Sequence, residues 1–555
     1  MRVSIDGGPA APANEVVIQA LDELLQPHNR SDAPGLVIGV ARHGRLVYRR
    51  GLGLASIEHG VANTAWTRMR IGSTSKHFAC LAALLLAEDG KLDLDDQVRR
   101  HFPELAPNAV EPTLRQLMNH TSGLRCYLDA GFLSDGLAVR PAGSGWAGQL
   151  RQRDVNFVAG QRFMYNNGGY HLLSLLIQRL GGMPFEQFLK ERIFAPLGMV
   201  DTLSLPSDFA IHSNMATLHV KQADGSYKRG IFPSMELLGE GAIASTIDDM
   251  LRWLAHLRGP KRVGSDASWE QMLAPTRLGN GVTVPYGLGL MRHQYRGTEV
   301  IHHAGAVFGG SCQMLTVPGH ALDIVILSNG AQVDVAALAK QVVDAALGDA
   351  LLEPAPARPE LDSFRPLLGK RYMSPSSGFV MGFAEADGRP ALSLLNLPPF
   401  PLDGDDRHWR LSFEDFAAGP FSIRRPGLAG DAAAPPTLQI SESGVEESYH
   451  LLPETGPAIG EVGRELAGRY SVPELDAEAV MYVDGAELKM EVKGHLNSTL
   501  MSFEPLAADV LGWQMTAAEL PLRGIARVQR QDGKVVALRF DTTRTRNLVF
   551  ERQGG

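Results

Sequence analysis

A serine and a lysine that together could carry out acyl transfer stand three residues apart, at Ser73 and Lys76. The apolar stretch 78–87 that follows predicts a helix, and residues three apart share one helix face. The hydroxyl and the amine should therefore point into the same space, where a partly desolvated lysine can help to activate a serine nucleophile. The N-terminus of the helix would also favour a developing negative charge at Ser73. The alternative is an N-cap serine beside a surface lysine.

Tyr165 and Asn167 form a second candidate group, in a loop flanked by glycines. A tight loop before an expected helix over 170–180 would display both side chains. A phenolate beside an ammonium group can act as a general base, because the nearby positive charge lowers its pKa. An ordinary turn with a packed tyrosine is the alternative.

A third group is the sequence His303-Ala304-Gly305. Side chains alternate along a strand, so the histidine and the glycine would share one face. The missing side chain of the glycine leaves room there for a substrate backbone along the strand edge. A core histidine or a metal ligand is the alternative. His302 and His303 would face opposite sides of a strand and could not share a metal ion, so we expect no metal site.

The elements that must position these groups alternate between strand and helix patterns over residues 15–350. Two alternating runs joined by a His-Gly turn predict a hairpin over 35–49. Strands, then a helical block, then further strands and a last helix indicate an α+β domain with a mostly antiparallel sheet. We expect helices over 78–89, 110–118, 170–180, 185–193, 247–257 and 333–347, and strands over 286–291 and 321–328.

The composition changes after residue 352. Alternating prolines over 352–359 predict an extended linker. Beyond it, short alternating runs between Gly and Asp turns indicate an all-β region. Two similar five-residue segments, 368–372 and 466–470, each open a stretch that ends in an apolar strand, which indicates a repeat. We therefore expect a catalytic domain over 1–352 and two small antiparallel β-barrel domains over 361–453 and 461–555.

The overall composition narrows the class of protein. A net charge of −8 without a basic cluster argues against a nucleic-acid partner. The three cysteines form neither a disulfide framework nor a metal motif, so we expect buried free thiols in a reducing compartment. The N-terminus has no apolar signal segment, and the apolar stretches are too short to span a membrane. We therefore expect a cytoplasmic protein without a membrane partner.

Taken in order, Ser-x-x-Lys, Tyr-x-Asn and His-x-Gly resemble the motifs of the penicillin-recognising serine hydrolases, the superfamily of β-lactamases and penicillin-binding proteins. The Tyr-x-Asn form is similar to that of the class C β-lactamase and DD-peptidase branch, as are the segments 117–124 and 241–250. Within that branch, the histidine of the third motif and the two C-terminal β-barrels resemble the D-aminopeptidases. The segments 68–71 and 467–477 extend this resemblance over nearly the whole chain.

The resemblance implies a mechanism. Ser73 would attack an amide carbonyl and become an acyl-enzyme, while Lys76 and Tyr165 would share the proton transfers as general base and acid. The N–H groups of Ser73 and Ala306 would hold the oxyanion.

The resemblance also implies binding roles. Asn167 would orient the substrate amide, and Gly305 would admit the substrate backbone. His303 replaces the more usual lysine, so positive charge there would depend on pH. Asn166 and Ala304 depart from the usual motif residues; neither position has a chemical role, so they bear on substrate preference.

Glu240 lies just before the segment 241–250. A carboxylate at the mouth of the site would repel the carboxylate of a penicillin and attract a free ammonium group. In D-aminopeptidases, by resemblance, this position carries the acid that binds the amino terminus of the substrate. A solvent-facing loop glutamate is the alternative. The loop 516–523 of the last domain would enter the cleft and limit the substrate at its amino end, with Glu519 as a second acid or a surface residue.

The expected function is therefore a serine hydrolase that releases N-terminal D-amino acids, similar to D-alanine, from small peptides and amides. A related esterase, amidase or β-lactamase-like hydrolase is the first alternative. A non-catalytic binding protein on the same fold is the second, although such a scaffold has no need of Ser73, Lys76 and Tyr165 together. We expect no cofactor. A homodimer is one assembly compatible with the resemblance, and the sequence does not specify the oligomeric state.

Overall fold

The protein is described by a computed structural model that covers residues 12–554, except 355–360, 387, 396, 405–407, 412–420, 425–432, 517–521 and the side chain of Ser363. The chain folds into two compact units. The first, called the sheet unit here, comprises Met1–Leu94, Tyr170–Thr276 and Pro285–Pro356. The second, called the barrel unit, comprises Asp95–Gly169, Arg277–Val284 and Ala357–Gly555. The predicted domain limits 1–352, 361–453 and 461–555 remain predictions.

The sheet unit is built on a six-stranded sheet in which each described pair of neighbours is antiparallel. The expected hairpin over 35–49 is present as β1 (Leu36–Arg42) and β2 (Arg45–Leu52). The expected strand over 286–291 begins only at its last residue, because Gly289 (φ +75°) lets the chain pass against the backbone of His77. The strand order is β12 (Met291–Tyr295), β13 (Thr298–Val307), β14 (Gly310–Val317), β15 (Leu322–Ser328), β1 (Leu36–Arg42) and β2 (Arg45–Leu52).

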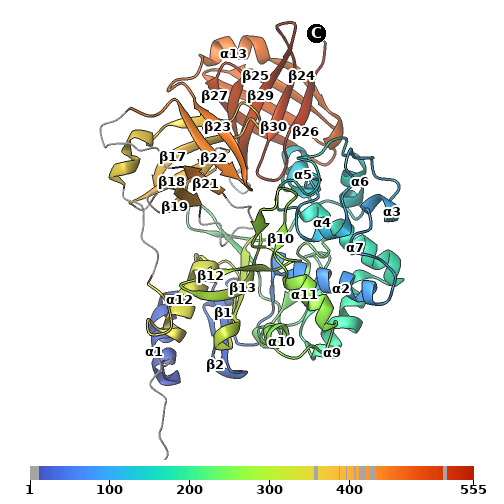
Figure 1. Ribbon diagram of the computed structural model, residues 1–555, viewed down its shortest axis with the longest axis vertical. Coiled ribbons are helices and arrows are strands. Elements are labelled where there is room, and N and C mark those ends of the chain that lie inside the picture. Colours follow the sequence, from blue (N-terminus) through green and yellow to red (C-terminus); the bar gives the residue numbers. More distant parts are fainter. Residues whose placement is uncertain are drawn as a thin grey trace, which may run out of the picture. The chain divides into compact units, whose positions relative to one another are not determined.

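Helices cover both faces of this sheet (Figure 1). On one face, α1 (Asn14–Leu25) and α12 (Val335–Leu347) bury apolar side chains against Ile38 and Val40 of β1. On the other face, α10 (Ile247–Arg258) packs on β1 where Gly39 alternates with those residues. A Cβ atom on Gly39 would lie 2.1 Å from Ile247 Cγ2, so the close approach of α10 requires glycine.

Helix α2 (Lys76–Glu88) lies in the interior of the sheet unit. Its residues from Lys76 to Leu86 are all buried, as expected for a helix that is apolar on all sides. Phe78 packs on Trp253 of α10, with ring centroids 4.2 Å apart. The helix also contacts α8 (Phe185–Leu189) and α11 (Asp266–Leu273). A short 3₁₀ turn, Gly72–Ser75, leads directly into α2.

The helical part of the barrel unit contains α3 (Val98–His101), α4 (Leu114–Met118), α5 (Tyr127–Asp135) and α6 (Ser144–Leu150). Helix α4 starts later than the expected 110–118, because Thr113 and Gln116 form a capping box that fixes its first turn. Helix α7 (Asn167–Gly181) begins in this unit and continues in the sheet unit.

Two closed barrels follow, which confirms the predicted fold class. In the repeated segments, Tyr372 and Tyr470 occupy the first strand of each barrel, and both rings are buried. The hydroxyls donate to backbone carbonyls, Tyr372 to Pro435 at 2.8 Å and Tyr470 to Leu466 at 2.6 Å. The first barrel consists of β16 (Arg371–Met373), β17 (Val380–Ala386), β18 (Arg389–Leu394), β19 (Phe400–Gly404), β20 (His408–Leu411), β21 (Phe421–Arg424), β22 (Thr437–Glu442) and β23 (Val445–Leu451). The second consists of β24 (Gly468–Val472), β25 (Ala477–Asp484), β26 (Glu487–Lys493), β27 (Ser498–Ala507), β28 (Val510–Met515), β29 (Arg523–Gln531), β30 (Lys534–Asp541) and β31 (Leu548–Arg552).

Arg125 anchors the helical part of the barrel unit to the second barrel. Its guanidinium is buried and donates two hydrogen bonds to the Glu474 carboxylate, at 2.7 and 2.9 Å. It also donates to the carbonyl oxygens of Arg546 and Asn547, at 2.9 and 3.2 Å. Both bonds to Glu474 come from Nη1, and together with the bonds to the carbonyl oxygens they make burial of the arginine charge tolerable.

The three cysteines are free and buried, as expected. Among the described residues, the structure has no helix that is both long enough and apolar enough to cross a membrane.

Replacing Arg125 by leucine should lower the free energy of unfolding by about 3–5 kcal/mol, because the Glu474 carboxylate would stay buried without its charge partner. The double variant Arg125→Leu/Glu474→Leu should recover part of this loss. As a control, Arg115→Leu removes the arginine of a more exposed pair with Asp95, with an expected change of about 1 kcal/mol or less. Urea unfolding measures all three variants, and equal losses for Arg125→Leu and Arg115→Leu would contradict the anchoring role.

Candidate active site

The side chains of Ser73 and Lys76 meet in the sheet unit. Lys76 Nζ donates to Ser73 Oγ at 3.0 Å and to the backbone oxygen of Glu240 at 2.7 Å. The lysine is fully buried, and Ser73 lies inside the 3₁₀ turn whereas the N-cap of α2 is Ser75, so the alternative of an N-cap serine beside a surface lysine does not hold. When the lysine is in its neutral form, the same contact lets the amine accept the proton of the hydroxyl.

The aromatic ring of Tyr170 lies next to the amine of Lys76. The ammonium lies 5.2 Å from the centroid of the Tyr170 ring, within the range of a cation–π contact. The Tyr170 hydroxyl in turn lies 3.3 Å from Cys80 Sγ. Tyr170 and Cys80 are both buried, on α7 and α2. The sequence motifs did not identify either residue, because only the fold brings α7 close to Lys76.

Strand β13 approaches the nucleophile turn at backbone distance. A Cβ atom on Gly305 would lie 1.9 Å from the Ile71 carbonyl oxygen and 2.9 Å from Ser73 N. A Cβ atom on Gly72, whose φ is +52°, would lie 2.6 Å from Ala306 N. The two glycines therefore allow the turn and the strand to pack directly on each other. The N–H groups of Ser73 and Ala306, expected to hold the oxyanion, belong to these two adjoining segments.

His303 is a neutral residue in this structure. Its Nδ1 lies 2.5 Å from the Ala304 carbonyl oxygen, which can only accept, so Nδ1 carries the proton. Its Nε2 lies 3.2 Å from the Tyr286 hydroxyl, which can donate to it. Burial and the charge of Lys76 lower the pKa of His303 to about 3. A positive charge on His303 would therefore require a pH far below neutral, and the pH dependence expected at this position stays a prediction.

The carboxylate of Glu240 is buried. Its Oε1 lies 3.4 Å from Nδ1 of His171 on α7. Burial alone would raise the pKa of the Glu240 carboxyl, but the hydrogen bond to His171 and its charge leave it below the usual value. The alternative of a solvent-facing loop glutamate does not hold. The sequence also gave no signal for His171 as the partner.

Tyr165 and Asn167 belong to the barrel unit. The ring of Tyr165 lies 4.2 Å from the ring of His120, and the Arg544 guanidinium lies 5.0 Å from the Tyr165 ring centroid. Asn166 donates from its backbone N–H to His120 Nδ1 at 3.0 Å. Its side chain donates to the Leu124 carbonyl at 2.6 Å and accepts from the N–H of Gly168 at 2.7 Å. Asn166, the departure from the usual motif, thus holds the Tyr-x-Asn loop in shape.

The predicted site residues therefore fall into two groups. Ser73, Lys76, Glu240, His303, Gly305 and Ala306 lie in the sheet unit, and Tyr165 and Asn167 lie in the barrel unit. Residues 517–521, which contain Glu519, fall outside the described residues, so the role of the loop 516–523 remains a prediction.

Comparison with known proteins relates the chain to curated relatives along most of its length. It is 27% identical over 536 residues to a D-aminopeptidase of Gluconobacter oxydans (strain 621H), covering 94% of this chain and 96% of that protein. It is 26% identical over 476 residues to a D-aminopeptidase of Brucella melitensis biotype 1, covering 84% of this chain and 85% of that protein. Both alignments are too long to be confined to the catalytic region, so they include barrel sequence.

A solved structure shows the same fold, and a family model matches more than half of the chain. The octameric penicillin-binding protein homologue from Pyrococcus abyssi has the same fold, with a TM-score of 0.55 and 19% identity over 87% of this chain and 99% of that one. The β-lactamase family model matches residues 17–347. This match covers more than half of the chain, so the chain belongs to the β-lactamase family of hydrolases.

Proposed function

We propose that the protein is a serine D-aminopeptidase, which releases N-terminal D-amino acids similar to D-alanine from small peptides and amino-acid amides. The observation that carries the proposal is the 3.0 Å contact between Ser73 Oγ and the buried Lys76 Nζ. The curated relatives named D-aminopeptidase support the substrate class, because they align over both the catalytic region and the barrels.

The reaction proceeds through an acyl-enzyme. Ser73 Oγ attacks the amide carbonyl carbon, and its proton passes through Lys76 and Tyr165 to the leaving amine as the C–N bond breaks. Water then attacks the ester and releases the D-amino acid, with the same groups moving its proton. The N–H groups of Ser73 and Ala306 hold the oxyanion, a contribution that is typically worth about 10²–10³ in rate for one donor.

The roles of Tyr165 and Asn167 are proposed from the order of the motifs. Tyr165 moves the proton between the hydroxyl and the leaving group, and Asn167 orients the substrate amide. Gly305 leaves the strand edge open for the substrate backbone.

The neutral state of His303 favours an amide substrate over a penicillin. A lysine in this motif would offer a cation to a substrate carboxylate. The imidazole instead donates its only N–H to the Ala304 carbonyl and carries no charge. This part of the site therefore has little to attract the carboxylate of a β-lactam, which makes the β-lactamase-like alternative the weaker one.

Glu240 supplies the negative charge that selects a free ammonium group on the substrate. Its contact with His171 fixes the orientation of the carboxylate, and burial reduces the screening of its charge by water. The three free cysteines favour a reducing compartment, so we place the protein in the cytoplasm. A homodimer remains a prediction.

Ser73→Ala should lower kcat/KM for D-alanine p-nitroanilide by about 10⁴-fold or more, because it removes the nucleophile. Mass spectrometry after treatment with a slow acylating substrate should place the adduct on Ser73. Ser75→Ala removes a neighbouring hydroxyl of the same turn and should keep the adduct. An adduct on any other serine would refute the assignment. Parallel assays with a chromogenic cephalosporin and a short-chain ester separate the aminopeptidase from its alternatives, and no turnover of any substrate would favour a binding protein.

Tyr165→Phe should lower kcat by about 10²–10⁴-fold with little change in KM, because it removes a proton-transfer group rather than a binding contact. Lys76→Ala should be at least as damaging, since Lys76 contacts the nucleophile directly. Steady-state kinetics on the same anilide separates the two parameters. A loss confined to KM would make Tyr165 a binding residue.

Glu240→Gln should lower kcat/KM for D-alanine amides by about 10- to 100-fold, the equivalent of a charge-assisted contact of about 1.5–3 kcal/mol. N-acetylated substrates have no ammonium group and should be almost unaffected. Glu270→Gln, which removes an exposed carboxylate from α11, is the matched control and should change neither rate. If the wild type cleaves N-acetyl-D-alanine amides as fast as D-alanine amides, the protein is a general amidase or esterase instead.

A further inference from the structure

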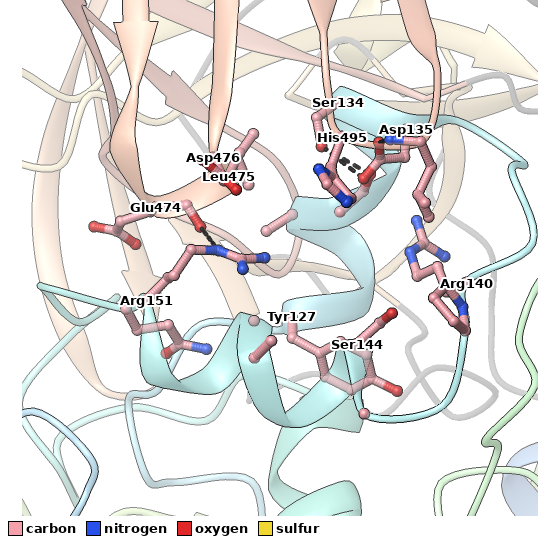
Figure 2. A pocket seen from close by; sticks show the side chains of 18 of the residues that line it. Tyr127, Ser134, Asp135, Arg140, Ser144, Arg151, Glu474, Leu475, Asp476 and His495 are labelled. Carbon is pink, nitrogen blue, oxygen red and sulfur yellow. Dashed lines mark hydrogen bonds between the residues drawn. The ribbon is translucent and has the colours of Figure 1, made fainter.

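A cavity of about 350 Å³ lies within the barrel unit, and its lining, among the described residues, includes none of those assigned to the reaction (Figure 2). One wall is formed by α5, α6 and the segment between them, and the other by the turn at Glu474–Asp476 and the loop at His495 of the second barrel. Its volume falls at the small end of the range for ligand sites, about 300–1,000 Å³. A molecule the size of an amino acid would fit.

Arg140 lines this cavity with a buried charge. The residue is 5% exposed, and its guanidinium lies 4.7 Å from the centroid of the Phe132 ring. Nη2 reaches the Gly136 carbonyl at 3.4 Å, whereas Nη1 is buried and has no hydrogen-bond partner among the described residues. Gly131 makes room for the guanidinium, because a Cβ atom there would lie 3.2 Å from Nη2.

The nearby carboxylate of Asp135 is engaged elsewhere. Its Oδ1 accepts from the backbone N–H of Leu496 at 2.8 Å, and its Oδ2 accepts from Ser134 Oγ at 3.3 Å. Within the described part of the chain, Arg140 has no ion pair within 4.0 Å. An arginine keeps its proton even when burial lowers its pKa, so this charge is buried without a carboxylate at ion-pair distance, although the charge of Asp135 acts on it from farther away.

A second arginine on the same cavity shows the contrast. Arg125 is equally buried, but Glu474 holds it with two hydrogen bonds, at 2.7 and 2.9 Å. The chain thus supplies a carboxylate to one buried guanidinium of the cavity and leaves the other without one. A buried polar group with unused hydrogen-bonding capacity requires an explanation, and an anionic ligand would provide it.

We propose that this cavity binds a free α-amino acid, whose carboxylate pairs with Arg140. A guanidinium matches a carboxylate with two parallel hydrogen bonds. The exposed carboxylate of Asp476 also lines the cavity, on its barrel wall, and it is the group that we propose for the ammonium end. The site is distinct from the proposed catalytic residues, so it can exist whether or not the protein is an aminopeptidase.

Calorimetric titration of the full chain with D-alanine tests the proposal, with D-alanine amide and inorganic phosphate as comparison ligands. D-alanine should bind. The amide should bind at least about 10-fold more weakly, because it lacks the carboxylate. Phosphate should not compete with D-alanine for the cavity. Arg140→Met should raise the Kd for D-alanine by about 10- to 100-fold. Ala147→Leu, which keeps Arg140 and fills the cavity from α6, should do the same.

Thermal unfolding, measured as Tm with and without D-alanine, separates a ligand-binding role of Arg140 from a structural one. Without ligand, Arg140→Met should melt at the same temperature as the wild type or higher, because it removes a buried charge that has no paired carboxylate. With D-alanine, the Tm should rise for the wild type only. A lower Tm for Arg140→Met without ligand would make Arg140 a structural residue and overturn the proposal.

Ser73→Ala and Glu240→Gln separate this site from the catalytic one. Both should bind D-alanine as the wild type does, even if the proposed reaction proves wrong. Loss of binding in Glu240→Gln with retention in Arg140→Met would assign the bound D-alanine to the catalytic site and refute the cavity as its place. Equal binding of D-alanine and its amide, or binding of phosphate alone, would also refute it.

Discussion

The proposed chemistry of the sheet unit depends on how closely strand β13 approaches the turn that holds Ser73. Gly72 and Gly305 both lack the side chain that would separate the two segments, and a Cβ atom on either would overlap the backbone of the other segment. Backbone N–H groups held in this way are already in place when negative charge develops on a substrate oxygen, so no reorganisation is needed at that moment. A larger residue at either glycine would therefore push the two segments apart and displace the N–H groups proposed to hold the oxyanion.

The same constraint explains why His303 is neutral. Burial removes the water that would stabilise a charged imidazole, and the strand also brings the ring near the charge of Lys76. The Ala304 carbonyl fixes the proton on Nδ1, and the Tyr286 hydroxyl lies at Nε2. In the proposed reaction, the weak attraction of this part of the site for a substrate carboxylate would follow from the uncharged His303, whose surroundings are set by the packing of β13 on the nucleophile turn.

The sequence could predict what depends on local spacing. The three-residue interval between Ser73 and Lys76 implies a shared helix face, and alternating runs imply the strands of both barrels. It could not predict contacts that join distant segments. His171 reaches Glu240 across 69 positions and Arg125 reaches Glu474 across 349, and neither pair leaves a periodic pattern. His171 as the partner of Glu240 and Tyr286 as the neighbour of His303 were missed for this reason.

The barrels bear on the Tyr-x-Asn loop through a short series of contacts within the barrel unit. Glu474 of the second barrel holds the side chain of Arg125. The preceding residue, Leu124, offers its carbonyl to the side chain of Asn166, which also binds the N–H of Gly168. Each contact is short and partly or fully buried, so a shift of the barrel turn would be passed to the loop rather than absorbed by solvent. The second barrel therefore contributes to the structure of the hydrolase region, because the turn that carries Glu474 helps to fix the loop of Tyr165 and Asn167.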